Sequence, residues 1–143
     1  MKKLIGNLTT YLSATILLVY GLIYLLRNRF MPYHSEAVSL NWEEVNPAMQ
    51  FLLIALMRAI AGGFISMAFA IFFLQYQFSH HKISWIPLLI LILGTISMFC
   101  TSYAIMQIWF HTPGRPPIAI VIAGELLLIV GYIFNRKYLR EPE

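Results

Sequence analysis

Charged side chains are scarce in this chain. Lys, Arg, Asp and Glu together make up 11% of its 143 residues, while hydrophobic types make up 59%. Soluble domains carry about 25% charged residues, so this composition excludes an ordinary soluble domain and indicates an integral membrane protein. The length suits a single domain, residues 1–143.

Cysteine is almost absent as well. The one cysteine, Cys100, cannot form a disulfide within the chain, so a small secreted fold held together by disulfides is excluded. Because Cys100 falls in an apolar run, we expect it to pack as a small hydrophobic residue.

Motifs that carry chemistry are also lacking. The four histidines show no metal-ligand spacing and none falls in the middle of an apolar run, so we expect no metal ion and no haem. No glycine-rich phosphate loop and no paired nucleophile and base stand out. The sequence therefore predicts no cofactor, and it leaves any catalytic residues unknown.

Basic residues are present, and the formal net charge is +4, but most of them flank apolar runs. The clearest examples are Lys2, Lys3, Arg136, Lys137 and Arg140. This placement is typical of charges that set membrane topology beside anionic lipid. We therefore expect membrane lipid as a partner and not nucleic acid.

Four apolar segments are long enough to cross a bilayer as helices, which takes about 20 residues each. They cover residues 8–26, 51–76, 85–110 and 118–135. The pair Asn46-Pro47 suits the start of the second helix, and Pro87 is tolerated in the first turn of the third. The predicted fold class is an all-α membrane protein with four transmembrane helices in an antiparallel bundle.

The distribution of Lys and Arg predicts the orientation of these spans. Four spans place both termini on one side, and the basic residues of that side are Lys2, Lys3, Lys82, Arg136, Lys137 and Arg140. The basic residues of the opposite side are Arg27, Arg29 and Arg115. The positive-inside rule therefore places both termini in the cytoplasm. The loop 27–47 is then extracytoplasmic, and we expect it to lie on the membrane surface with a capping box from Asn41 to Glu44.

Two charges lie inside the apolar segments, Arg58 in the second and Glu125 in the fourth. A charge in a bilayer costs at least about 2.5 kcal/mol, so it normally needs a partner. Counted from the outer span ends at about 1.5 Å per residue, each lies about 10 Å deep. Tyr20 and Tyr103 fall at the same count, with Gln107 one turn above Tyr103. We therefore predict a polar layer in the outer half of the bundle, whereas the inner half is mainly Leu, Ile, Phe and Ala.

The role of this layer stays open on the sequence alone. Arg58 and Glu125 fit a buried ion pair that fixes helix register. They also fit a pair that lines a ligand site or a proton site. A third interpretation leaves them unpaired, with the Arg58 side chain extending to the outer headgroups.

Small residues recur along the second span at spacings of three and four. This small-residue stripe consists of Ala55, Ala59, Gly62, Gly63, Ser66 and Ala70. Such a stripe permits close approach of helix backbones, and we expect it to pack within the chain, with Gly94, Gly124 and Gly131 among its counterparts. The alternative is a contact with a second copy of the chain or with a partner membrane subunit.

The string Met31-Pro32-Tyr33-His34, followed by Trp42, Arg58 and the pair Gly62-Gly63, resembles a family of small, uncharacterised bacterial four-span membrane proteins. In outline the chain is also similar to DoxX-like four-helix membrane proteins, although it lacks their glycine-rich first span. The resemblance implies a four-helix bundle and a multi-pass protein of the cell membrane, in this case a bacterial inner membrane. It carries no activity with it.

Three classes of function fit a small membrane protein with an outward-facing intramembrane polar site. The first is a binding or sensing bundle, and the second is an accessory subunit that docks on a partner. The third is a membrane enzyme or a small oligomeric transporter in which Glu125 carries protons. Whether the protein is an enzyme stays open.

Overall fold

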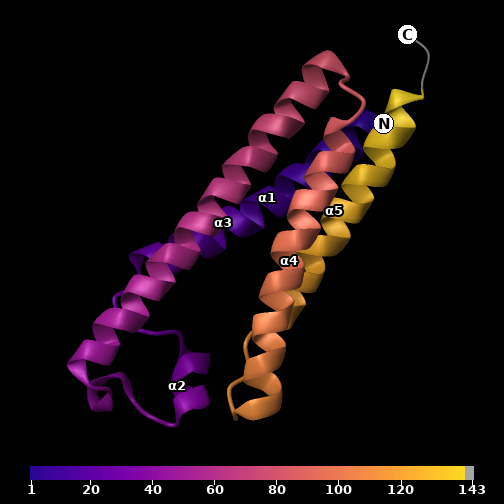
Figure 1. Ribbon diagram of the computed structural model, residues 1–143. Coiled ribbons are helices and arrows are strands. Elements are labelled where there is room, and N and C mark those ends of the chain that lie inside the picture. The colour runs from indigo at the N-terminus through magenta and orange to yellow at the C-terminus, as the bar shows by residue number, and fades with distance from the viewer. Residues whose placement is uncertain (141–143) are drawn as a thin grey trace.

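The computed structural model describes residues 1–140, and throughout that range the regular structure is helical, without a strand (Figure 1). In chain order the elements are α1 (Lys2–Leu26), α2 (Pro32–Val38), a 3₁₀ turn η1 (Trp42–Glu44), α3 (Pro47–His81), α4 (Ile86–His111) and α5 (Ile118–Leu139). The four long helices α1, α3, α4 and α5 are each long and apolar enough to cross a membrane.

Local sequence signals set where these elements begin and end. Asn46 caps α3, since its Oδ1 accepts a hydrogen bond of 2.9 Å from the backbone N–H of Ala48. The backbone N–H of Asn41 donates to Glu44 Oε2 at 2.7 Å, which confirms the expected capping box around η1. At the other end of α3, Lys82 adopts a left-handed conformation with φ 48°, and the helix stops there.

The long helices extend beyond the apolar segments from which they were predicted. The largest difference is in α3, which has 35 residues and continues to His81. Hydropathy detects only the apolar part of a helix. A polar turn, such as the one around Ser79, can continue the helix beyond the apolar segment. The helix α1 likewise starts at Lys2.

The first helix lies between two others. α1 packs along both α3 and α5, while α4 packs on α5 and meets α3 near their connecting turn. Along the α1–α5 contact, Gly6 lies against Asn135, and Gly131 lies against Thr10. From the turn at residues 82–85, α3 and α4 diverge, and α2 lies between their far ends (Figure 1).

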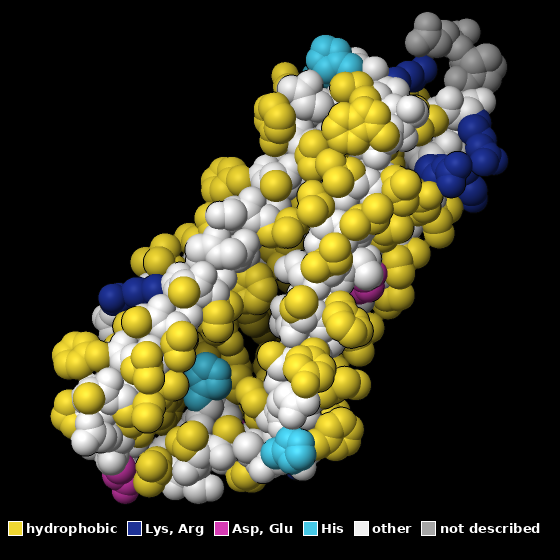
Figure 2. Space-filling model, in the orientation of Figure 1, with side chains coloured by type: hydrophobic (Ala, Val, Ile, Leu, Met, Phe, Trp, Pro, Cys, Tyr) yellow, Lys and Arg dark blue, Asp and Glu magenta, His cyan; other side chains and the backbone are white. Residues whose placement is uncertain are grey.

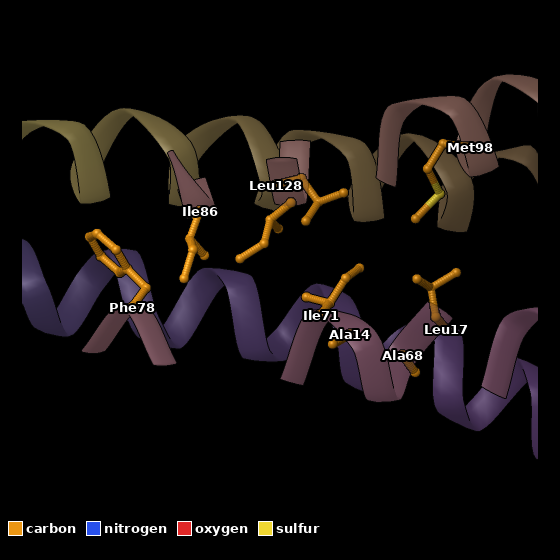
Figure 3. Close-up of a cluster of buried hydrophobic side chains, with 9 residues drawn as sticks. Ala14, Leu17, Ala68, Ile71, Phe78, Ile86, Met98 and Leu128 are labelled. Carbon is orange, nitrogen blue, oxygen red and sulfur yellow. The ribbon is translucent and has the colours of Figure 1, made fainter. Parts of the chain in front are cut away.

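The apolar core is concentrated where α3 and α4 are still close together. Its buried members labelled in Figure 3 are Ala14, Leu17, Ala68, Ile71, Phe78, Ile86, Met98 and Leu128, and Ile90 belongs to the same cluster. Gly94 of α4 permits this packing, because a Cβ atom there would lie 2.2 Å from Leu128 Cδ1. A second, smaller cluster at the other end of the molecule contains Phe30 of the loop and Met57 of α3.

A polar network crosses the end of the bundle where α1 begins and α5 ends, in a half that the sequence predicted to be mainly apolar. Gln75 Nε2 donates to Asn7 Oδ1 at 2.7 Å, and Ser79 Oγ donates to the same oxygen at 2.9 Å. Asn135 Nδ2 donates to Gln75 Oε1 at 3.1 Å. Gln75 and Asn135 are fully buried, so three helices, α1, α3 and α5, are joined by side-chain amides away from solvent.

The small-residue stripe of α3 does not pack within the chain, which corrects the expectation stated above. All six of its members are exposed, and a Cβ atom on Gly62 or Gly63 would have nothing within 4 Å. The glycines expected as its counterparts pack elsewhere, with Gly124 against Met98. The alternative contact, with a second copy or a partner subunit, stays a prediction.

Candidate functional site

Arg58 and Glu125 are not brought together. Arg58 is exposed on α3, and no ion pair joins it to any residue between 1 and 140. Gly21 of α1 packs against Ala61, one turn from Arg58, whereas Ser13 of α1 donates to the carbonyl of Gly124 at 3.0 Å. Gly21, which packs near Arg58, and Ser13, which packs near Glu125, are eight residues apart on α1, or about 12 Å along the helix axis. The expectation that Arg58 and Glu125 lie at the same depth therefore does not hold. When helices cross at an angle, residues at equal counts from the helix ends lie at different depths.

Glu125 has a different surrounding. Its Oε1 accepts a hydrogen bond of 2.7 Å from Thr95 Oγ1 of α4, while Oε2 is buried without a partner among the described residues. A shallow groove of about 260 Å³ between α4 and α5 runs beside it, lined mainly by apolar side chains such as Phe99 and Leu126. Glu125 thus belongs to the outside of the α4–α5 pair and not to the centre of the molecule.

The other three residues of the predicted polar layer also separate. Tyr103 is 61% exposed on α4, and Gln107, one turn further on, is exposed too. Neither lines the groove beside Glu125 or the larger cavity between α3 and α4. Tyr20 is half-buried and lines the larger cavity, so it is the one residue of these three that borders a large space inside the molecule.

That space is a cavity of about 670 Å³ between the diverging helices. Figure 2 shows it as a hollow between α3 and α4, with a histidine side chain at its edge. The side chains around it are mostly apolar and come from α1, α3, α4 and α5; they include Leu53, Met57, Ile60, Met67, Met98 and Ile105. No Asp, Glu, Lys or Arg lines it, so the cavity is uncharged along its length.

Ser97 and Thr101 of α4 add hydroxyl groups to the wall, but the aromatic polar side chains lie together at one end of the cavity, beside α2. The four side chains of this polar end are Tyr20, Tyr24, Tyr33 and His34. The hydroxyls of Tyr24 and Tyr33 share a hydrogen bond, and the rings of Tyr33 and His34 meet edge-on at 4.4 Å between centroids. The Tyr20 hydroxyl has no hydrogen-bond partner among residues 1–140, and the Tyr20 side chain lines the cavity.

The backbone at the start of α2 fixes how His34 presents its ring. Nδ1 of His34 accepts the backbone N–H of Met31 at 3.3 Å, which is the reciprocal half of the cap on α2. Burial, and then the charge of Arg27, lower the pKa of His34 from its ordinary value. His34 is therefore neutral at pH 7 with its proton on Nε2, which makes that nitrogen a hydrogen-bond donor.

The Tyr33 hydroxyl also stays protonated, because burial and the hydrogen bond with Tyr24 raise the pKa of Tyr33. Tyr33 and His34 come from the loop that the sequence analysis placed on the membrane surface. A helical signal was present there, since Pro32 suits a first turn. The way α2 folds back over the end of α1 is a tertiary contact that no local pattern encodes.

No metal-binding site is evident in residues 1–140. No three His, Cys, Asp or Glu side chains within that range are placed to hold an ion together. The chemical character of the cavity is thus that of an apolar pocket with hydroxyl and imidazole groups at one end.

Comparison with known proteins returns no relative. No family model, no curated protein and no solved structure matches the chain. The resemblance drawn from its short motifs stays a prediction, and the function must be argued from the cavity itself.

Proposed function

We propose that this protein is a membrane-embedded binding protein whose antiparallel four-helix bundle holds a lipid-soluble ligand between α3 and α4. The observation that carries the proposal is the cavity of about 670 Å³, which falls within the range of small-molecule sites. Its lining follows the usual pattern of such sites, mostly apolar with a small number of polar groups, the largest of which lie at one end.

The bilayer supplies the route of entry. Both termini lie at the cytoplasmic face in this proposal, so the polar end of the cavity, beside α2, lies in the outer half of the membrane. α3 and α4 diverge toward that half (Figure 1), and the hollow between them is open on the face shown in Figure 2, so in this proposal the ligand enters from the side, out of the lipid. An apolar solute already dissolved in the bilayer enters such a space without crossing water.

Two adjacent glycines provide a matched test. Gly63 lines the cavity and Gly62 does not, yet a Cβ atom at either position would meet nothing within 4 Å. Gly63→Leu should fill part of the cavity and lower the amount of lipid-soluble molecules that remain bound after purification in detergent, by about fivefold or more. Gly62→Leu should leave the retained amount unchanged. Native mass spectrometry of both variants and of the wild-type protein measures it.

The matched pair also separates binding from assembly. Gly62 belongs to the exposed small-residue stripe, so an effect of Gly62→Leu on oligomer size alone would report a contact of that stripe with another subunit. The same retained ligand in Gly63→Leu as in the wild-type protein, with both folded, would contradict a binding role for the cavity.

A further inference from the structure

The chemistry of the ligand follows from the polar end of the cavity, given that the cavity binds a ligand at all. We propose that the ligand is an uncharged lipid with an acceptor oxygen near one end of a long apolar chain, such as the carbonyl of an acyl ester. Its oxygen lies among Tyr20, Tyr33 and His34, and its chain extends toward Met67 and Met98.

Hydrogen-bond donors are in excess at this end. Nδ1 of His34 is occupied by the Met31 N–H, so only the donating Nε2–H faces outward from the ring. The Tyr24–Tyr33 pair uses one hydroxyl hydrogen and leaves the other available. Tyr20 adds a third donor that no described residue accepts.

The position of Tyr20 means that bulk water does not satisfy this donor. Tyr20 lies six residues before Leu26, the last residue of α1, which is about 9 Å along the helix. At that distance inside an apolar span, a hydroxyl without a partner is costly, and a ligand oxygen is the acceptor that the site lacks.

The absence of charge in the lining selects against ionic ligands. An ammonium head would find no carboxylate among the lining residues, and a carboxylate head would find no cation in direct contact. Arg27 lies close enough to His34 to influence it, and its Nε is buried without a partner, but it does not line the cavity. An anionic lipid that reached Arg27 is therefore the rival that an experiment must separate.

The test uses the full chain in detergent micelles and one radiolabelled probe, methyl palmitate. Unlabelled hexadecane, hexadecanol, palmitate and hexadecylamine serve as competitors of similar chain length. Methyl palmitate should bind the wild-type protein, and hexadecanol should compete for the same place because its hydroxyl oxygen also accepts. Palmitate and hexadecylamine should compete at least tenfold more weakly than hexadecanol, because each carries a charge.

Removing one donor isolates the hydrogen bond. Tyr20→Phe should weaken methyl palmitate binding about five- to tenfold and leave the weaker binding of hexadecane unchanged. Tyr103→Phe removes an exposed hydroxyl that lines no cavity, and it should change neither. Unchanged hexadecane binding shows that the Tyr20→Phe protein is folded.

The outcomes distinguish this inference from the proposal on which it rests. If hexadecane binds as tightly as methyl palmitate and Gly63→Leu weakens both, the cavity is a binding site but its head-group chemistry is not the one proposed. If palmitate competes best, and Arg27→Gln abolishes its advantage, the ligand is anionic and the inference is overturned. If no chain binds and Gly63→Leu changes nothing, the binding function itself fails.

Discussion

A charged side chain inside an apolar span normally needs a partner or access to polar surroundings, and Arg58 and Glu125 meet this need in different ways. Arg58 is exposed on α3, between Ala61 and the start of that helix, and in the proposed orientation its long side chain can extend to the outer headgroups. Glu125 instead accepts a hydrogen bond from the Thr95 hydroxyl of α4. A short carboxylate cannot extend out of the apolar layer, so a neighbouring helix supplies its hydrogen bond.

His34 makes the stability of the protein depend on pH. Its folded-state pKa is lowered by burial and by Arg27, so between that value and its ordinary value near 6.5 the unfolded chain binds more protons than the folded one. The contribution of His34 is therefore complete above about pH 6.5 and is lost as pH falls through the folded-state pKa. The melting temperature of the detergent-solubilised protein should be lower at pH 5.5 than at pH 7.5.

Replacing the imidazole identifies the source of that difference. His34→Gln cannot titrate, so the difference in melting temperature between the two pH values should shrink in this variant. His111→Gln changes an exposed histidine at the end of α4 and should leave the difference as it is. An equal pH effect in His34→Gln and wild-type protein would show that another group is responsible.

At the scale of the helix, the buried side-chain amides fix the register of α1, α3 and α5. Apolar contact alone would not prevent one helix from shifting along another. Gln75 receives a hydrogen bond from Asn135 of α5 and donates one to Asn7 of α1, so it holds α3 in register with both. In a bilayer, where lipid tails are as apolar as the side chains, such bonds and close packing provide the attraction between helices.

Removing that central amide should destabilise the protein. Gln75→Leu leaves the Nδ2 group of Asn135 without its acceptor in a fully buried position, and we expect a loss of about 1–2 kcal/mol in the free energy of unfolding. Gln77→Leu is the matched control, because Gln77 lies on the same helix and makes no hydrogen bond to the described residues. Reversible unfolding in mixed micelles, followed by circular dichroism, measures both. Equal losses in the two variants would mean that the network contributes no stability.

For the molecule as a whole, the sequence predicted the elements better than the contacts between them. Long apolar runs and caps such as Asn46 are local signals, and each corresponds to a helix or a helix start in the structure. Depth counting failed for Arg58 and Glu125, because it assumes that helices stand side by side at equal tilt. Of the residues at the polar end of the cavity, the sequence predicted Tyr20 as a site residue. It did not predict His34, which reaches this end only because α2 folds back.

The proposed orientation of the whole molecule has a direct test. With both termini in the cytoplasm, a reporter enzyme that works only outside the cytoplasm should be inactive when fused to the C-terminus. The same reporter inserted after Ser39, an exposed residue where α2 ends, should be active. The reverse pattern would place the polar end of the cavity in the inner half of the membrane. A cytoplasmic reporter at both positions provides the complementary control.

The central position of α1 has a consequence for how the protein is made. α1 is synthesised before α5, yet its Ser13 hydroxyl donates to the backbone carbonyl of Gly124, 111 residues later in the chain. At the usual pace of synthesis, that interval is on the order of ten seconds. Until α5 has been synthesised, the Ser13 hydroxyl of α1 lacks this acceptor, so the α1–α5 contact forms only after that interval.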